Sequence, residues 1–173
     1  MNSAKPQIMA PAGSWESLSA ALKAGADSVY FGVEKLNMRA RAAKKFTLTD
    51  IQEVVERCRK KNADAYLTLN TLVYDNEIGI MKDICRAAAA AGVSAVIASD
   101  WAAITFADSL GLPVHISTQA NISNLESVTF FSRFANAVVL ARELSLEQVS
   151  HISEAIKKNN IRRKEGKLLR IDT

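Results

Sequence analysis

The sequence contains few of the residues that most often bind metals or carry covalent chemistry. Its 173 residues include two cysteines and two histidines. Cys58 and Cys85 form no Cys-x-x-Cys pair and have no nearby histidine, so we expect two reduced thiols that pack on helices as small apolar groups. A zinc or iron–sulfur site built from this chain alone is therefore not expected, and we assign no metal ligand.

Glycine clusters and long apolar runs are also missing. A single glycine, Gly13, follows the first expected strand, which leaves no glycine-rich dinucleotide fingerprint there. No stretch approaches the roughly 20 apolar residues that span a bilayer. Residues 1–14 lack the apolar core of a signal peptide. We therefore expect a cytoplasmic protein without a membrane span.

The composition that is present belongs to an ordinary globular domain, with 49% apolar and 23% charged residues. The net charge of +4 is unevenly spread, because a basic run crowds residues 157–173. This run indicates either a solvated connection after a helix or a segment that attracts RNA through phosphate contacts.

Short apolar runs alternate with amphipathic stretches along the whole chain. The helices are expected after Ser14 and Thr49 and then over 76–91, 101–110, 124–134 and 145–159, each placed by apolar residues at helical spacing. The strands are expected at 7–10, 28–31, 65–69, 95–98, 114–117, 137–140 and 168–171.

Strict alternation of strands and helices predicts parallel pairing with right-handed crossovers, either in a barrel or in an open doubly wound sheet. The repeat of about 25–35 residues favours a (β/α) barrel. The strand patterns agree: Leu67 and Leu69 point one way while Tyr66, Thr68 and Asn70 point the other, and Val114 and Ile116 likewise oppose His115, Ser117 and Gln119. One face of the sheet is thus polar or mixed, as suits a barrel with a site in its interior.

A complete barrel of the TIM type has eight strands and usually about 250 residues. This sequence supplies six βα units and the opening of a seventh strand, so we expect residues 1–173 to form one incomplete, truncated α/β barrel domain. The unpaired edges at the first and sixth strands would then favour self-association.

Polar residues that follow the expected strands should meet at the carboxyl ends of the barrel, where such folds bind ligands. Amides and arginines there suit a planar polar or anionic ligand. We predict a substrate-binding set of Asn37, Arg39, Arg41, Asn70, Gln119, Asn121 and Arg142.

The same rim has neither cysteine nor histidine, and it lacks an activated nucleophile beside a base. Ser117 and His115 lie two residues apart on one strand face, about 6.5–7 Å, which is too far for a direct hydrogen bond without side-chain reach. We expect His115 in the interior and His151 at the surface. The remaining candidates for acid–base catalysis are Asp100 and Glu143, which could also hold a metal.

Four blocks of the sequence resemble the collagenase-like peptidase family, peptidase family U32, in its amino-terminal portion. They are APAGSWESLSAALKAGADSVYFG at 10–32, NMRARAAKKF at 37–46, ISTQANISN at 116–124 and VVLARELSLEQV at 138–149. They follow the family's order and span nearly the whole chain.

The resemblance implies a peptidase of unknown catalytic type, with collagen-degrading activity in some members. Other members resembling this sequence are oxygen-independent hydroxylation proteins that act on tRNA uridine, on a ribosomal RNA cytidine or in ubiquinone synthesis. Those members hold a 4Fe–4S cluster on four cysteines beyond the strand that would follow Ile171, and none of these cysteines lies in this sequence. We therefore expect no cofactor in this chain.

Three hypotheses follow. In the first, the chain is part of a cluster-dependent enzyme that hydroxylates an RNA base, of the tRNA uridine type, and the chain alone is inactive. The second is a collagenase-like peptidase acting on protein substrates. The third is a non-catalytic barrel that binds RNA or another ligand.

Overall fold

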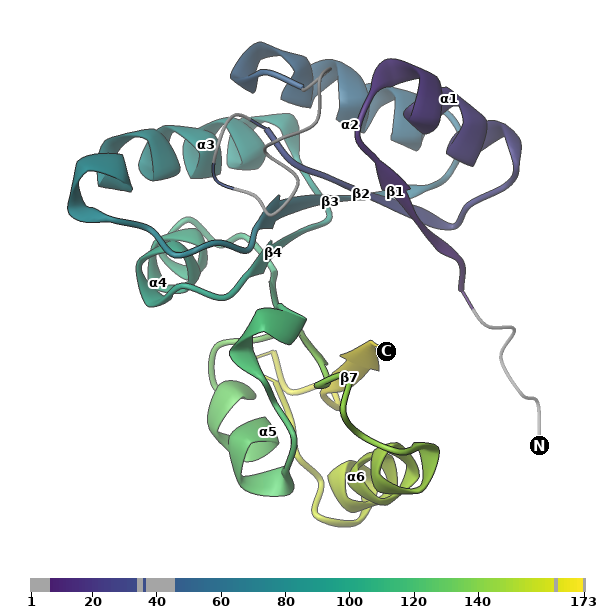
Figure 1. Cartoon of the computed structure of the whole chain (residues 1–173), viewed down its shortest axis with the longest axis vertical. Coiled ribbons are helices and arrows are strands. Elements are labelled where there is room, and N and C mark those ends of the chain that lie inside the picture. Colours follow the sequence, from purple (N-terminus) through teal and green to yellow (C-terminus); the bar gives the residue numbers. More distant parts are fainter. Residues whose placement is uncertain (1–6, 34–35, 37–45, 164, 173) are drawn as a thin grey trace.

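The computed structural model describes residues 7–33, 36, 46–163 and 165–172. Seven strands form one parallel sheet in the order β1-β2-β3-β4-β5-β6-β7, so every strand pairs with its neighbours in sequence. Figure 1 shows this sheet curling as an open half-barrel of the TIM type, with helices around its outside. The strands are β1 Met9–Ala12, β2 Ser28–Phe31, β3 Asp64–Leu69, β4 Ala95–Ala98, β5 Val114–Ile116, β6 Ala137–Val139 and β7 Arg170–Asp172.

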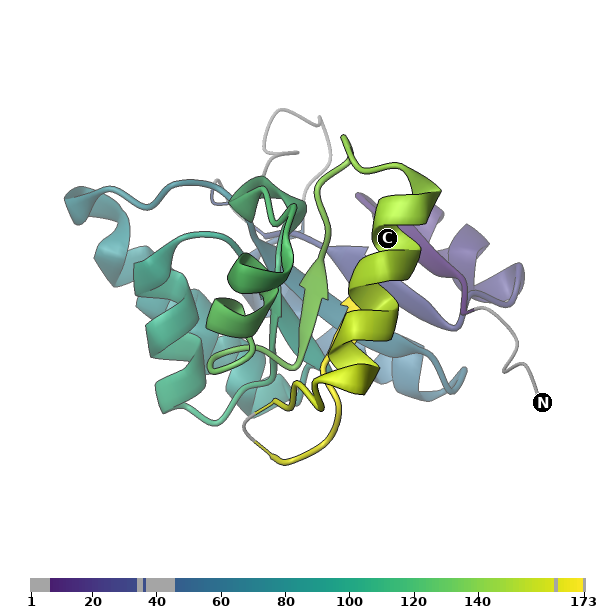
Figure 2. The same ribbon diagram turned by 90° about the horizontal axis from the view of Figure 1, so that it is seen from below.

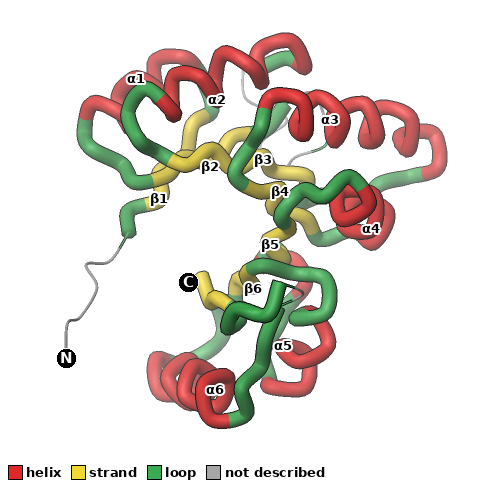
Figure 3. Tube along the Cα trace, turned by 180° about the vertical axis from the view of Figure 1, so that it is seen from behind, coloured by secondary structure: helices red, strands yellow, loops and turns green. Residues whose placement is uncertain are grey.

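A helix follows each of the first six strands and lies on the convex side of the sheet (Figures 2 and 3). None of the helices in the described residues is long and apolar enough to cross a membrane. The helices are α1 Trp15–Lys23, α2 Ile51–Arg59, α3 Ile78–Ala91, α4 Trp101–Ser109, α5 Leu125–Phe131 and α6 Leu146–Lys158, with short 3-10 turns η1 Leu48–Asp50, η2 Asp75–Glu77 and η3 Thr118–Ala120.

Local sequence explains where several helices begin and end. Ser14, Asn124 and Ser145 are N-caps whose side chains accept a hydrogen bond from a backbone N–H of the first turn. Gly92 ends α3 with φ of 73°, a conformation that glycine adopts without steric cost. These signals fix the starts of α1, α5 and α6 and the end of α3.

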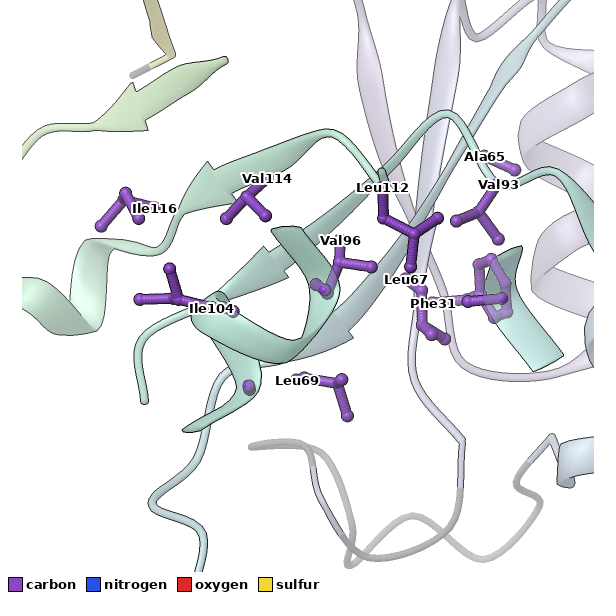
Figure 4. Close-up of a cluster of buried hydrophobic side chains, with 14 of the residues drawn as sticks. Phe31, Ala65, Leu67, Leu69, Val93, Val96, Ile104, Leu112, Val114 and Ile116 are labelled. Atoms are coloured by element: carbon purple, nitrogen blue, oxygen red, sulfur yellow. The ribbon is translucent and has the colours of Figure 1, made fainter. Parts of the chain in front are cut away.

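The main core lies between the convex face of the sheet and the helices. Aliphatic side chains from alternate strand positions fill it, among them Leu67, Leu69, Val96, Val114 and Ile116, all buried (Figure 4). Because successive strand residues point to opposite faces, the residues between these positions point into the concave side. The alternation expected from the sequence is confirmed.

The main differences from the expected elements lie at the two edges of the sheet. β1 is shifted toward the carboxyl end and runs through Pro11, which an edge strand tolerates although proline lacks an N–H. The seventh strand forms at Arg170–Asp172 and pairs with β6. The first strand is an open edge, as expected, whereas the other open edge is β7 and not the sixth strand. Self-association through these edges stays a prediction.

Candidate functional site

The concave side of the half-barrel encloses a cavity of about 910 Å³ at the carboxyl ends of the strands. Residues near both edges of the sheet line this cavity, so the curl of the sheet brings them together. The lining residues are Met9, Ala12, Gly13, Tyr30, Phe31, Gly32, Thr68, Asn70, Ile97, Ser117, Thr118, Gln119, Val139, Leu140, Ala141, Arg142, Leu144, Leu146 and Val149.

Three of the predicted binding residues line this cavity together. Asn70 directly follows β3, Gln119 lies in η3 after β5, and Arg142 lies in the loop after β6. The loop that carries Arg142 is attached to the segment after η3, because the Ala141 N–H donates to the Ile122 carbonyl at 2.9 Å. The cavity thus offers two amides and a guanidinium, which together donate and accept hydrogen bonds.

Three of the hydroxyl groups in the cavity wall, those of Thr68, Ser117 and Thr118, take part in structural hydrogen bonds. The Thr68 hydroxyl donates to the Phe31 carbonyl at 3.0 Å, and the Thr118 hydroxyl donates to the Leu140 carbonyl at 3.4 Å. The Ser117 hydroxyl accepts from the Gln119 N–H at 3.3 Å. None of the three is paired with a general base in these contacts, so they provide polar lining rather than an activated nucleophile.

A second polar group lies on the concave face away from the cavity lining. His115 is 4% exposed, its ring lies 4.9 Å from that of Tyr66, and its Nε2 lies 3.4 Å from Arg170. Arg170 forms an ion pair of 2.9 Å with Asp172. The interior position expected for His115 is confirmed, and the basic residue Arg170, whose side chain is 43% exposed, contacts this buried imidazole from the solvent side.

Burial is the main cause that lowers the pKa of His115 to about 4, and the nearby Asp172 carboxylate opposes the shift only in part. The imidazole is consequently neutral at pH 7. Its 3.5 Å separation from Asp172 is then a polar contact and not an ion pair. His151, on α6, is exposed as expected.

The two predicted catalytic carboxylates do not line the cavity. Asp100 caps α4: one carboxylate oxygen accepts from the Ala102 N–H at 2.8 Å and the other from the Val73 N–H at 3.1 Å. Glu143 is exposed in the loop after β6. The geometry gives Asp100 a clear structural role, and the acid–base function of this pair stays a prediction.

The other predicted binding residues lie elsewhere. Asn121 ends η3 in the left-handed conformation, with φ of 52°, and is exposed outside the cavity lining. Asn37, Arg39 and Arg41 fall outside the described residues.

The residues of this chain do not fit the iron–sulfur cluster that the family resemblance implies for other members. Cys58 and Cys85 are buried free thiols on α2 and α3, as expected, and burial raises the pKa of each to about 11. Cluster iron binds thiolates, which these sites disfavour. In the described part of the chain, no group of three or more His, Cys, Asp or Glu side chains could hold a metal ion.

Sequence reasoning missed the apolar part of the cavity. Leu144, Leu146 and Val149 line it from the loop after β6 and from α6, and Met9 lines it from the opposite edge of the sheet. The helical period of α6 indicated only a core-facing stripe. Which of its residues face the cavity depends on how the sheet curls, and no local pattern encodes that.

The fold and the cavity define a (β/α) half-barrel protein with a ligand-sized site at the carboxyl ends of its strands. Residues 13–162 match the model of Peptidase family U32, and the chain belongs to this family. It is 54% identical over 166 residues to a protein named Collagenase from Porphyromonas gingivalis (strain ATCC BAA-308 / W83), covering 96% of this chain and 40% of that protein.

A more distant relative carries a different name. The "tRNA hydroxylation protein P1" of Bacillus subtilis (strain 168) is 33% identical over 155 residues, covering 88% of this chain and 36% of that protein. The chain thus spans about 40% of the length of the first of these curated relatives and less of the second.

Solved structures agree on the fold. The U32 peptidase Mk0906 matches with a TM-score of 0.67 at 16% identity, covering 89% of this chain and 66% of that chain. The tryptophan synthase alpha subunit of Legionella pneumophila str. Paris matches with a TM-score of 0.57 at 18% identity, covering 95% of this chain and 71% of that chain. At these identities the likeness concerns the fold alone.

Proposed function

We propose that this half-barrel is the substrate-binding part of a collagenase-like peptidase, and that its cavity binds a segment of polypeptide. The observation that carries the proposal is the cavity itself, with amide and guanidinium groups beside apolar ones, in a chain 54% identical to a collagenase. A peptide backbone presents both donors and acceptors. The side-chain amides of Asn70 and Gln119 can donate to and accept from such a backbone, and Arg142 can donate to carbonyl or carboxylate oxygens.

The proposal concerns binding because the Thr68, Ser117 and Thr118 hydroxyls of the cavity wall take part in structural hydrogen bonds. Peptide hydrolysis needs an activated nucleophile or water and a base to remove its proton. The lining residues of this half-barrel supply hydrogen bonds and apolar contact, which position a substrate. We therefore assign orientation of the polypeptide to this part of the protein.

The first prediction tests the polar side of the cavity. Fluorescently labelled gelatin fragments should bind the purified chain, and Arg142→Ala should weaken that binding about tenfold, as loss of a charged hydrogen-bond donor does. Fluorescence anisotropy measures both affinities. Arg133→Ala is the matched control, because Arg133 is exposed in the segment between α5 and β6 and does not line the cavity.

Equal binding by Arg142→Ala and the parent chain would contradict the placement of the substrate at this rim. A gelatin zymogram run beside the binding assay reports hydrolysis, and clearing of the gelatin would extend the role of this chain from binding to cleavage.

The second candidate function is recognition of an RNA base for hydroxylation. The 33% identity to a tRNA hydroxylation protein and the position of Arg142 at the rim favour it, since a guanidinium also binds phosphate. Unlabelled tRNA distinguishes the two candidates as a competitor. If tRNA displaces gelatin, and if both Arg39→Ala and Arg142→Ala weaken tRNA binding without unfolding the chain, RNA replaces polypeptide as the proposed substrate.

A further inference from the structure

The loop after β6 and the first turn of α6 are held by a full set of local interactions. Ser145 is the N-cap: its N–H donates to Gln148 Oε1 at 2.8 Å, and its Oγ accepts from the Gln148 N–H at 3.3 Å. Leu144 and Val149 flank this capping box at the positions of a hydrophobic staple, and both pack against the core. Each of these four side chains therefore has a role in the fold.

Leu146 lies among them and has no such role. It is the first residue of α6, and 88% of its surface is exposed, the largest fraction among the exposed large apolar residues of the described chain. Helix capping requires nothing of a leucine at this position, since its orphan backbone N–H is the same for any residue other than proline. Yet the side chain lines the cavity. Exposure alone would need no explanation, but Leu146 borders the cavity together with other apolar lining residues, and this position places it to contact a ligand.

The surroundings of Leu146 define what that contact would be. Val139, Leu144 and Val149, which lie near Leu146 in the sequence, line the same cavity, so Leu146 adds an exposed apolar side chain to this part of the lining. Arg142 lines the cavity from the same short loop, four residues before Leu146. A ligand that used both would place an apolar group beside a carbonyl or carboxylate oxygen, which is the arrangement of an apolar residue within a peptide.

We propose that Leu146 is a specificity-determining residue that contacts an apolar side chain of the bound polypeptide. This inference rests on the proposed function, because it takes the ligand to be a peptide. It adds the substrate class: peptides with an aliphatic residue next to the backbone group that Arg142 binds. A leucine side chain moved from water into apolar contact contributes enough to change affinity by about tenfold.

The test compares two blocked hexapeptides rich in glycine and proline, one carrying a central leucine and the other a central serine. Binding of each to the whole chain is measured by isothermal titration calorimetry. The parent chain should bind the leucine peptide about tenfold more tightly than the serine peptide. Leu146→Ala should remove most of that preference by weakening only the leucine peptide, and the affinity for the serine peptide should stay the same.

Leu168→Ala is the matched control, since Leu168 is an exposed leucine just before β7 that does not line the cavity; it should keep the full preference. If the parent chain binds both peptides equally, or if Leu146→Ala keeps the preference, the inference is overturned while the proposed function stands. If neither peptide nor gelatin binds, the proposed function fails and this inference fails with it.

Discussion

The two faces of the sheet differ in chemistry although they alternate residue by residue along the same strands. The convex face carries aliphatic side chains such as Leu67 and Ile116, which pack under the helices and are fully buried. The concave face carries Thr68, Ser117 and His115, which form hydrogen bonds or polar contacts. Neighbouring residues on one strand therefore have different roles: those on the convex face stabilise the half-barrel, and those on the concave face line the candidate site.

Because the two faces are separate, residues that line the cavity can vary while the packing under the helices is kept. Close packing on the convex face penalises any change of volume there. The concave face borders the cavity and carries a polar group beside a small apolar cluster of Tyr66, Ala95 and Ile97. Substitution of the polar residues that line the cavity therefore removes individual contacts rather than main-core packing. Family members named for proteolysis and for RNA hydroxylation are compatible with this division.

The largest effect is expected on the convex face. Leu67→Ala should lower the free energy of unfolding by about 2–5 kcal/mol, because Leu67 is 0% exposed and its truncation leaves a cavity in the main core. Urea denaturation followed by circular dichroism measures the change. Leu72→Ala, three residues beyond β3 at a side chain 70% exposed, should change stability by less than about 0.5 kcal/mol. If both variants lost a similar amount of unfolding free energy, the convex face would not be the main source of stability.

The next effect belongs to the concave face and depends on pH. The pKa of His115 is lowered to about 4 in the folded chain, from an ordinary value of 6.5. Between these values the unfolded chain binds a proton that the folded chain does not, so stability falls as pH drops from about 6.5 toward 4. The loss at this group is on the order of 3 kcal/mol. His115→Gln should flatten the slope of unfolding free energy against pH in that window.

His151→Gln is the control for this titration, since His151 is exposed and should leave the pH slope unchanged. If His115→Gln left the pH slope intact, other groups would be responsible for the acid sensitivity. The imidazole of His115 would then be more accessible to water than its burial indicates.

Much of the fold was predictable because it depends on local periodicity. The two-residue alternation in β3 and β5 identified which side chains face the helices, and the N-caps and glycines marked the helix ends. Parallel order followed from the alternation of strands and helices. The edges were predicted least well, because a short strand such as β7 is defined by its partner β6 and not by its own sequence.

The site was predictable only where position along a strand was enough. Asn70, Gln119 and Arg142 follow strand ends, and the structure brings them to one cavity; their binding of substrate stays a prediction. Asp100 also follows a strand end, but it immediately precedes α4. Its carboxylate accepts a hydrogen bond from the backbone N–H of Ala102 and so caps the helix. The contact between His115 and Arg170 joins residues 55 positions apart, and it depends on the curl and register of three strands.

The smallest expected effect compares Thr68 with its neighbour Leu67 on the same strand. The Thr68 hydroxyl donates to the Phe31 carbonyl at 3.0 Å across β2 and β3 and faces the cavity. Thr68→Val keeps the shape and removes this hydrogen bond, so the free energy of unfolding should fall by about 1 kcal/mol, measured by the same urea denaturation. A loss as large as that of Leu67→Ala would mean that the concave face is packed like the convex one. A loss near 1 kcal/mol, with the expected large loss at Leu67, would show two adjacent residues of β3 contributing to stability in different ways.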